Sequence, residues 1–446
     1  MGNRDNRIVL PRTYINRGNN NLSFIESCYP VDIEAADGNA TSPFILRAEK
    51  VPTRIAHSIS GGIKGVLEVG NGNIHIYGLN KIYNLNSVGD ITEIFTKTDG
   101  DFEGEDMVII RGQRYVLISD SSNSWYYDFT SDDITLTSTG IGVVELGDYY
   151  NGRFFVKTDT SSLNDSTFRY SSLNLGVENP GSWEGFDVIA SRSSPDPITN
   201  IMSYGDSLFI GGTKSIDIWS HQVALEGVPV ALIRSIKTGM YQSIKKFDFL
   251  VFVGDGGVIN VFDTENGGVR VISPDNLRVK KTDTIWAYRD GRTIHIRVGK
   301  YVFEVFGSSW RLTSNLLEGM DYCADVESPT IETQTYFFTK RGSIYRLSDN
   351  KISRTKLVFQ PMATDDSRHI GIASISLYTE DDLPDANATL YYTTNKGISW
   401  IEKQTVKTNT KGRYLWTSFG ISRNFTFMIR TENIKEIHDC QIAEIY

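Results

Sequence analysis

Side chains that could bind a metal are scattered along this chain of 446 residues. Its histidines never occur as an HxH or HxxxH pair or beside a cysteine pair, the spacings that zinc sites use; they are His57, His75, His221, His295, His369 and His438. We therefore predict no metal site and no cofactor. His75 and His295 each stand between two isoleucines, so we expect both imidazoles on the strand face opposite the core; neither has an obvious partner in the sequence.

The cysteines, Cys28, Cys323 and Cys440, are odd in number and far apart in sequence. This usage predicts no disulfide framework and favours synthesis in a reducing compartment. The first residues lack the apolar core of a signal peptide, and the longest apolar runs, such as Phe249 to Val253, have the length of strands. We expect neither an export signal nor a membrane span.

Motifs of common enzyme classes are missing from the sequence. There is no GxSxG, no GxxxxGK[ST] and no GxGxxG opening a helix. The glycine pairs lie between predicted strands, where we expect turns with positive φ; they are Gly61-Gly62, Gly211-Gly212, Gly256-Gly257 and Gly267-Gly268. Four acids could pair as the acid and nucleophile of a glycosidase, but the sequence does not tell which face each one, so no pair is supported: Asp106, Asp187, Glu304 and Glu318. We predict a protein that is not an enzyme and name no catalytic residue.

Composition indicates a folded, β-rich chain. It contains 39 glycines, only 12 prolines, 22 tyrosines, 22 phenylalanines and 7 tryptophans, which favours many tight turns and half-buried pleated surfaces. The formal net charge is −9. A protein that grips DNA needs a basic face, so tight DNA wrapping is disfavoured, whereas a smooth acidic conduit for DNA is compatible with this balance.

One plan recurs along the chain: a turn rich in Gly, Asp or Asn, an apolar strand, a second turn, and a strand with aromatic residues. The first strands of these units contain Ile74, Tyr115, Phe154, Leu208, Leu250, Thr293 and Tyr336. Most intervals are roughly 40 to 45 residues, the length of a propeller blade. The longer interval after Phe154 requires an insertion, for which Asn174 to Pro197 has a loop-like composition. We predict an all-β protein with a β-propeller of about seven blades, with six or eight also open.

The repeat stops near Lys356, and the remaining strands suffice for a small β-sandwich. The predicted organisation is an N-terminal arm and lead-in (1–64), a β-propeller (65–356) and a C-terminal β-sandwich (357–446). A pair of β-sandwiches is the alternative fold, but it does not predict regular recurrence. The arm, Met1 to Asn21, carries four arginines against one acid. It is either a mobile tail or a segment that orders against a neighbouring subunit.

Two short motifs suggest other propeller classes. Thr393 to Trp400, TTNKGISW, resembles the Asp-box hairpin of sialidase-like propellers, but Asn395 replaces the aspartate and the motif occurs once. A receptor-binding or glycan-cleaving propeller is therefore the alternative function. Ile218-Trp219-Ser220 is faintly similar to the WD signature of cellular scaffold propellers, without a Gly-His in any unit.

Three stretches resemble the packaged-DNA stabilisation, or tail hub, proteins of short-tailed bacteriophages. The first is Tyr29 to Val51, YPVDIEAADGNATSPFILRAEKV, and the second is Ser207 to Ser220, SLFIGGTKSIDIWS. The third is the C-terminal region, with ATLYYTTNKGISWIEKQ, GRYLWTSFG, NFTFMIRTE and HDCQIAEIY in that order. Together they cover about a quarter of the chain. The arm Met1 to Asn21 departs from the family in being more basic and richer in asparagine.

The resemblance implies a structural virion protein, synthesised in the host cytoplasm and placed in the phage tail. Its expected assembly is a homo-oligomeric ring, a hexamer, below the portal and its adaptor or head-to-tail connector proteins. Such a tail nozzle would extend the DNA channel, help retain the packaged genome until DNA ejection, and attach a tail needle, plug, tailspike or fibre. DNA would pass without tight or sequence-specific binding.

Overall fold

The computed structural model describes nearly all of the chain from Lys50 onward and only strands before it. The described residues are 5–8, 24–26, 28–32, 44–48 and 50–445, without 132, 160–166, 173–187, 191–195, 222–228, 264–266, 275–276, 291–292, 307–308, 313–316, 329–330, 353–354, 359–361, 364–368, 381–384, 396–398, 404–405 and 408–411. Most of these residues form strands and the turns between them, and the 3-10 turn η1 (Asp255–Gly257) follows β23 (Leu250–Gly254). No helix in this part of the chain is long and apolar enough to cross a membrane.

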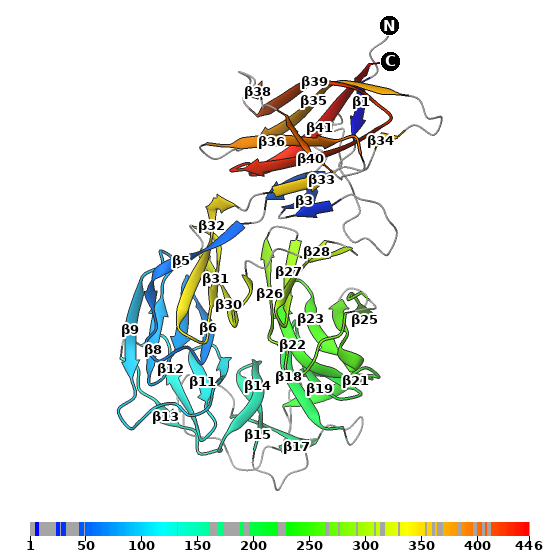
Figure 1. The fold of residues 1–446 in the computed structure, drawn as a ribbon. Coiled ribbons are helices and arrows are strands. Elements are labelled where there is room, and N and C mark those ends of the chain that lie inside the picture. The colour runs from blue at the N-terminus through cyan, green and yellow to red at the C-terminus, as the bar shows by residue number, and fades with distance from the viewer. Residues whose placement is uncertain are drawn as a thin grey trace.

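The described residues contain seven four-stranded antiparallel sheets, which are the blades of a β-propeller (Figure 1). Blades 1 to 3 consist of β6 (Gly65–Gly70), β7 (Asn73–Tyr77), β8 (Lys81–Leu85) and β9 (Ile91–Thr96); β10 (Val108–Arg111), β11 (Tyr115–Ser119), β12 (Ser124–Asp128) and β13 (Thr137–Ser138); and β14 (Val144–Tyr150), β15 (Arg153–Thr158), β16 (Thr167–Tyr170) and β17 (Val188–Ala190). Blades 4 to 6 consist of β18 (Ile198–Tyr204), β19 (Ser207–Gly212), β20 (Ile216–His221) and β21 (Val230–Ile236); β22 (Met240–Lys246), β23 (Leu250–Gly254), β24 (Ile259–Asp263) and β25 (Gly268–Val271); and β26 (Ile285–Asp290), β27 (Thr293–Val298), β28 (Tyr301–Phe306) and β29 (Ser309–Leu312).

The seventh blade closes the ring with a strand from the other end of the chain. It consists of β30 (Tyr322–Ser328), β31 (Ile331–Phe338), β32 (Ser343–Ile352) and, as its outermost strand, β5 (Lys50–Ser58). The first strand of each blade packs against the first strand of the next, and β30 packs against β6. The seven-bladed prediction is confirmed, and each anchor residue chosen from the sequence lies in the second strand of its blade. Most of the predicted insertion, Asn174 to Pro197, lies outside the described residues.

Blade-to-blade packing supplies the core of the propeller. Seven separate apolar clusters are found among the described residues, one between each pair of neighbouring blades. The second strands are covered on both faces, so β23 (LVFVG) is buried at every position and β27 (TIHIRV) likewise. Such strands need no alternation between apolar and polar residues.

This double burial overturns the expectation for two histidines. His75 on β7 and His295 on β27 are only 5% and 4% exposed. His75 Nδ1 lies 2.8 Å from the Tyr127 hydroxyl, and the His295 ring stacks on Tyr288 with centroids 4.5 Å apart. The prediction that both imidazoles lie on the face opposite the core was wrong, because a neighbouring blade covers that face as well and makes it part of the core.

The second domain is a sandwich of two antiparallel sheets, seen at the top of Figure 1. One sheet has the order β3-β4-β41-β35-β39-β38 with β1 paired to β41, and the other has the order β2-β33-β40-β36-β37 with β34 paired to β40. The bounds are β1 (Asp5–Ile8), β2 (Phe24–Glu26), β3 (Cys28–Asp32), β4 (Phe44–Ala48), β33 (Thr355–Val358), β34 (Met362–Ala363), β35 (Ile370–Glu380), β36 (Asn387–Thr393), β37 (Ile401–Lys403), β38 (Val406–Lys407), β39 (Arg413–Ser422), β40 (Asn424–Glu432) and β41 (Glu436–Ile445). Its core includes the fully buried Tyr414 and Trp416.

The structure divides the N-terminal 64 residues differently from the prediction. Strands β1 to β4 belong to the sandwich and β5 belongs to the propeller, so the chain starts in the C-terminal domain, crosses to the propeller, and returns through β33. Of the predicted arm, the described residues are those of β1, which pairs with β41 of the same chain. Strand pairing between distant segments has no periodic signal in the sequence, which explains the difference.

Two glycine pairs also behave differently from each other. Gly61 and Gly62 have positive φ, +82° and +88°, as predicted for a turn. Gly211 and Gly212 instead lie inside β19, where a Cβ on Gly212 would come 2.3 Å from Asp196 Oδ2. The turn prediction for this second pair was wrong, because glycine is needed there for close approach of a side chain and not for its φ angle.

Closure of the propeller by β5 leads to a first prediction. Ile55 packs against the apolar cluster between blades 7 and 1, whereas Arg54 is exposed. We expect Ile55→Asp to lower the free energy of unfolding by about 2 kcal/mol, because it places a carboxylate against apolar side chains. Arg54→Asp is the matched control and should cost less than about 0.5 kcal/mol. Urea unfolding and limited proteolysis within β32 would measure both; equal effects would contradict a closing role for β5.

Candidate functional site

The innermost strands bring a lysine and two acids together across the propeller axis. Lys245 on β22 in blade 5 places Nζ 2.9 Å from Glu68 Oε1 on β6 in blade 1 and 3.1 Å from Asp325 Oδ2 on β30 in blade 7. The Asp325 backbone N–H donates to the same Glu68 oxygen at 2.6 Å, and the Thr335 hydroxyl donates to Asp325 Oδ1 at 2.8 Å. Three blades are therefore joined at one point, which we call the axial cluster (Glu68, Lys245 and Asp325).

The next residue on the same strand makes a second bridge. Lys246 Nζ lies 2.5 Å from Asp148 Oδ2 on β14, and that oxygen also accepts the Ser203 backbone N–H at 2.6 Å and its hydroxyl at 3.0 Å. The pairing of β22 with β23 shifts register between Ser243 and Lys245. A bulge of this kind redirects side chains, so two successive lysines reach acids on different blades.

The axial cluster holds its lysine in the charged form. Burial lowers the pKa of Lys245, but the charges of Glu68 and Asp325 outweigh burial and raise this pKa above its ordinary value. Burial raises the pKa of the neighbouring Cys323 thiol well above its ordinary value. A charged lysine and a protonated thiol are poor bases and nucleophiles, so the chemistry available here is the electrostatic joining of blades.

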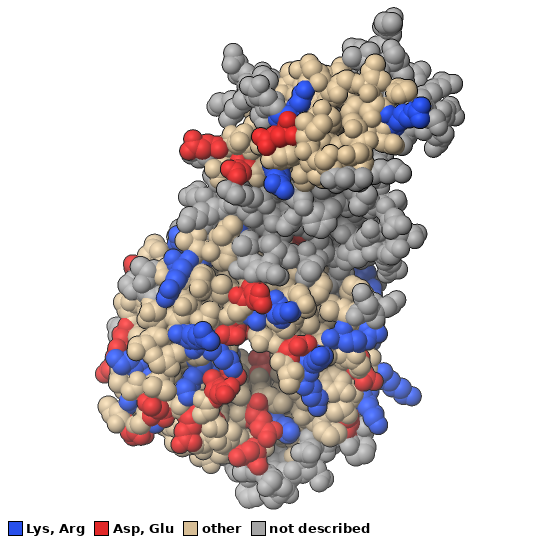
Figure 2. Space-filling view, in the orientation of Figure 1, with Lys and Arg blue, Asp and Glu red and all other residues tan. Residues whose placement is uncertain are grey.

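A third group of polar side chains lies near the loop that leads into β10. The Tyr322 hydroxyl donates to Asp106 Oδ1 at 2.5 Å, and Lys340 Nζ lies 2.6 Å from Asp106 Oδ2. Burial, together with the Asp106 carboxylate, raises the pKa of Tyr322 above its ordinary value. Figure 2 shows acidic and basic side chains interspersed around a central opening on this view of the propeller. Positive and negative groups are mixed there, without a single-sign field.

The acids considered from the sequence do not converge in the described part of the chain. Asp106 is paired with Lys340, while Glu304 is buried in β28, opposite His295 in the strand register. Glu318 is exposed in the loop before β30, and Asp187 lies outside the described residues. In the same part of the chain, no group of three or more His, Cys, Asp or Glu residues could hold a metal ion. Cys323 and Cys440 are thiols and form no disulfide.

The Asp-box-like hairpin is present as a structural element of the sandwich. β36 pairs with β37 in an antiparallel hairpin. The Asn395 side chain accepts the Ser399 backbone N–H at 3.0 Å and donates to the Ser399 hydroxyl at 2.8 Å. An asparagine thus holds the turn where the sialidase-like motif has an aspartate.

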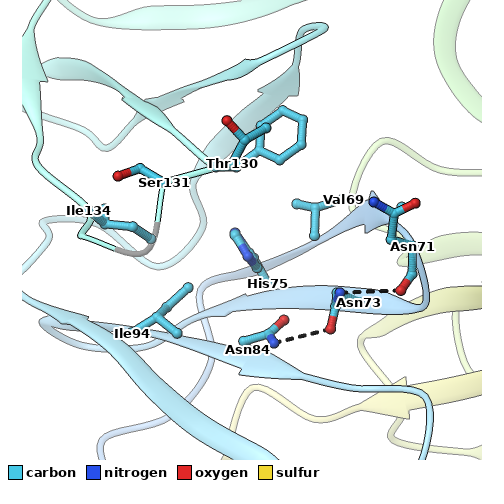
Figure 3. Close-up of a pocket in the computed structure, with 11 residues that line it drawn as sticks. Val69, Asn71, Asn73, His75, Asn84, Ile94, Thr130, Ser131 and Ile134 are labelled. Atoms are coloured by element: carbon cyan, nitrogen blue, oxygen red, sulfur yellow. Dashed lines mark hydrogen bonds between the residues drawn. The ribbon is translucent and has the colours of Figure 1, made fainter.

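A pocket of about 380 Å³ lies between blades 1 and 2 (Figure 3). It is lined by Val69, Gly70, Asn71, Asn73, His75, Asn84, Ile94, Phe129, Thr130, Ser131 and Ile134. Beneath it, His75 Nδ1 contacts the Tyr127 hydroxyl at 2.8 Å, and that hydroxyl contacts the Tyr77 hydroxyl at 2.6 Å. Burial lowers the pKa of His75 to about 4. The imidazole is therefore neutral at physiological pH.

Sequence reasoning missed both the lysines of the axis and the asparagines of this pocket. Lys245 and Lys246 stand in an ordinary polar stretch, and Asn73 and Asn84 look like common turn and strand residues. Only His75 had been singled out, and its surroundings had been predicted incorrectly. A weak signal was available, since an isolated histidine in a second strand of a propeller must be buried and needs a partner.

Comparisons with known proteins address the fold alone. No family model matches the chain, and no curated protein matches it. Among solved structures, the one titled "YCF48 bound to D1 peptide" has 12% identity and a TM-score of 0.43, covering 68% of this chain and 96% of the other. A chain of the "Crystal Structure of Mitotic Checkpoint Complex" has 12% identity and a TM-score of 0.44, covering 72% and 99%. A third, "KlHsv2 with loop 6CD replaced by a Gly-Ser linker", has 13% identity and a TM-score of 0.37, covering 60% and 92%.

Proposed function

We propose that this chain is a non-catalytic, ring-forming subunit of the tail of a short-tailed bacteriophage. In this role it extends the DNA channel below the portal and its adaptor, helps to retain packaged DNA, and carries attachment surfaces for needle, plug or tailspike proteins. The sequence resemblance of Tyr29 to Val51, of Ser207 to Ser220 and of the C-terminal strands supports this function. The ring is expected to be a homohexamer with each subunit presenting two different faces to its neighbours.

The observation that carries the proposal is the double crossing of the chain between its two domains. β1 to β4 complete the sandwich, β5 completes the propeller, and β33 to β41 complete the sandwich again. If the N-terminal strands detached from either domain, the strands that they pair with would become edge strands with unpaired backbone groups. This construction suits a subunit that bears load in an assembly.

The electrostatics of the propeller also fit a conduit better than a DNA clamp. The net charge is −9, and the lysines at the axis, Lys245 and Lys246, are engaged by acids of the same chain. A protein that neutralises many phosphates binds DNA tightly and would slow its exit. Interspersed charges on the surface in Figure 2 offer no continuous basic track.

Native mass spectrometry and electron microscopy test this function. We expect particles of six 50.1 kDa chains and rings that are also found in tails isolated from virions. Ile233 and Val271, 57% and 56% exposed, lie on the outermost strands of neighbouring blades, and we place one ring contact there. Exposed aliphatic side chains on edge strands favour association.

The variants Ile233→Glu and Val271→Glu should shift the ring to monomers. The nearby exposed Lys237→Gln changes the net charge by the same one unit, so it serves as the charge-matched control and should leave the ring intact. A chain that stays monomeric at all concentrations and is missing from isolated tails would refute the proposed function. Rings that survive both substitutions would move the contact elsewhere without affecting the function itself.

A further inference from the structure

The pocket between blades 1 and 2 has the features of a ligand site. It lies beside the β6–β7 turn, which contains Asn71, and the β12–β13 loop, which contains Thr130 and Ser131. Its volume of about 380 Å³ falls in the range of small-molecule sites. Figure 3 shows His75, Asn73 and Asn84 rising from adjacent strands on one side of the cavity, with Thr130 and Ser131 on the other.

The hydrogen bonds beneath the pocket decide which nitrogen of His75 carries the proton. Tyr77 and Tyr127 are buried, and the only side-chain contacts of their hydroxyls among the described residues are with each other and with His75. If Tyr77 donates to Tyr127 and Tyr127 donates to Nδ1, both hydroxyl protons are used. The reverse order would leave the buried Tyr77 proton without an acceptor, at a cost of about 1 to 3 kcal/mol. His75 therefore carries its proton on Nε2.

His75 as a whole is 5% exposed, and its Nε2–H makes no hydrogen bond to a residue that the structure describes; the hydrogen bond of its ring is made by Nδ1. His75 lines the pocket. Because Nδ1 is directed at Tyr127, the opposite edge of the ring is directed at the cavity. An N–H that opens into a pocket takes its acceptor from water or from a ligand.

The asparagines supply a matching acceptor. Asn84 Nδ2 donates to Asn73 Oδ1 at 3.1 Å, and Asn73 Nδ2 donates to the Asn71 carbonyl at 3.3 Å. This chain orients both amides and leaves Asn84 Oδ1, a buried atom, without a hydrogen-bond partner in the described structure. Asn84 itself lines the pocket, beside Asn73 and His75 (Figure 3).

The remaining surface of the pocket is apolar or neutral. Val69, Ile94, Phe129 and Ile134 form its apolar part, and none of the described residues that line it carries a charge at neutral pH. An uncharged cavity does not compensate the free-energy cost of removing an ionic ligand from water. Paired donors and acceptors beside aliphatic and aromatic walls match a molecule with hydroxyl groups on one face and C–H groups on the other.

We propose that the pocket between blades 1 and 2 binds a neutral polyhydroxylated ligand, such as one sugar unit. His75 Nε2–H donates to one hydroxyl oxygen, and Asn84 Oδ1 accepts from a neighbouring hydroxyl. The site does not depend on ring assembly. A failure to bind such a ligand would therefore not contradict the proposed tail function, and a failure to form rings would not contradict the ligand site.

Saturation-transfer NMR of the full-length protein with a panel of neutral methyl glycosides tests the site. The panel contains the glucoside, galactoside, mannoside and rhamnoside, with glucuronate and inorganic phosphate as charged probes. We expect at least one neutral glycoside to bind and to shift the His75 Nε2–H resonance. Asn84→Leu, which removes the acceptor, should weaken binding about tenfold, and Ile94→Trp should abolish it by filling the cavity.

Ser131→Ala is the matched control. Ser131 lines the same pocket, but its hydroxyl donates to the Asp133 carbonyl at 3.0 Å within its own loop, so this variant should bind normally. The proposal is overturned if no neutral glycoside binds, if only the charged probes bind, or if Asn84→Leu and Ile94→Trp both retain full affinity while circular dichroism shows them folded.

Discussion

Replacing Lys245 by methionine is expected to lower the free energy of unfolding of the propeller by about 2 to 3 kcal/mol. The substitution leaves Glu68 and Asp325 close together without the cation that joins them, and breaking a largely buried ion pair costs more than a surface pair is worth. The Lys245 side chain is 23% exposed, and that of Asp325 is 14% exposed. Urea unfolding followed by hydrogen exchange of amides in β6, β22 and β30 would measure the loss.

The neighbouring lysine provides the control. Lys246 also pairs with an acid, but its side chain is 40% exposed, so Lys246→Met should cost less than about 1 kcal/mol. Similar losses for the two variants would contradict a special role for the axial cluster. A triple variant, Glu68→Gln, Lys245→Met and Asp325→Asn, should recover part of the stability, because it also removes the two carboxylates that Lys245→Met leaves without a cation.

The pH dependence of the Lys245 contribution follows from the direction of its pKa shift. The folded-state pKa lies above the ordinary value of 10.5. The contribution is therefore fully present below pH 10.5 and is lost as the pH rises through the folded-state pKa. We expect the stability difference between the wild type and Lys245→Met to be constant around neutral pH and to shrink only in strong alkali.

Tyr127→Phe is the second substitution with a large expected effect. It removes the hydroxyl that accepts from Tyr77 and donates to His75, so two buried polar groups lose their partner. Each such group costs about 1 to 3 kcal/mol, and we expect a total loss of about 2 to 6 kcal/mol in the free energy of unfolding. Thermal and urea unfolding would measure it. Tyr126→Phe, on the adjacent position of β12, is a control that leaves this chain of hydrogen bonds intact.

The double variant with His75→Phe sharpens this test. If the hydroxyl acts through His75, the cost of Tyr127→Phe should be smaller in the His75→Phe background, because one of the two orphaned groups is already absent. Strict additivity of the two costs would contradict the hydrogen-bond chain.

Acidification should act through the same histidine. Burial lowers the pKa of His75 from 6.5 to about 4, so the folded state disfavours the charged imidazole. The stabilising effect of the neutral form is fully present above pH 6.5 and is lost as the pH falls from about 6.5 through 4. In the His75→Phe variant, this part of the pH dependence should disappear.

The number of blades could be predicted because its causes are local. Each blade is marked by turn residues and by an apolar second strand, and all seven anchor residues from Ile74 to Tyr336 lie in second strands. Turn chemistry and strand composition act within a few residues, so they are readable from one segment at a time. The end of the repeat was predicted near Lys356. In the structure β32 ends at Ile352, and the sandwich strand β33 (Thr355–Val358) runs across that position.

The environment of the candidate site could not be predicted in this way. The IHI pattern around His75 was interpreted as one buried and one exposed face, whereas blades 1 and 2 bury both. The partner of His75, Tyr127, is in another repeat, and nothing in the sequence marks the two as neighbours. The same holds for Lys245, whose acids are in blades 1 and 7.

By itself the sequence determined an all-β chain, seven repeated sheets and a second small β domain, because strand length, turns and apolar patterning are properties of short segments. Only the tertiary structure decided that β5 closes the ring, that β1 to β4 belong to the sandwich, and that His75 and Lys245 are buried among residues from other blades. These features arise from edge pairing and from packing on both faces of a sheet. Both bring together residues that are distant in sequence, and neither leaves a periodic signal.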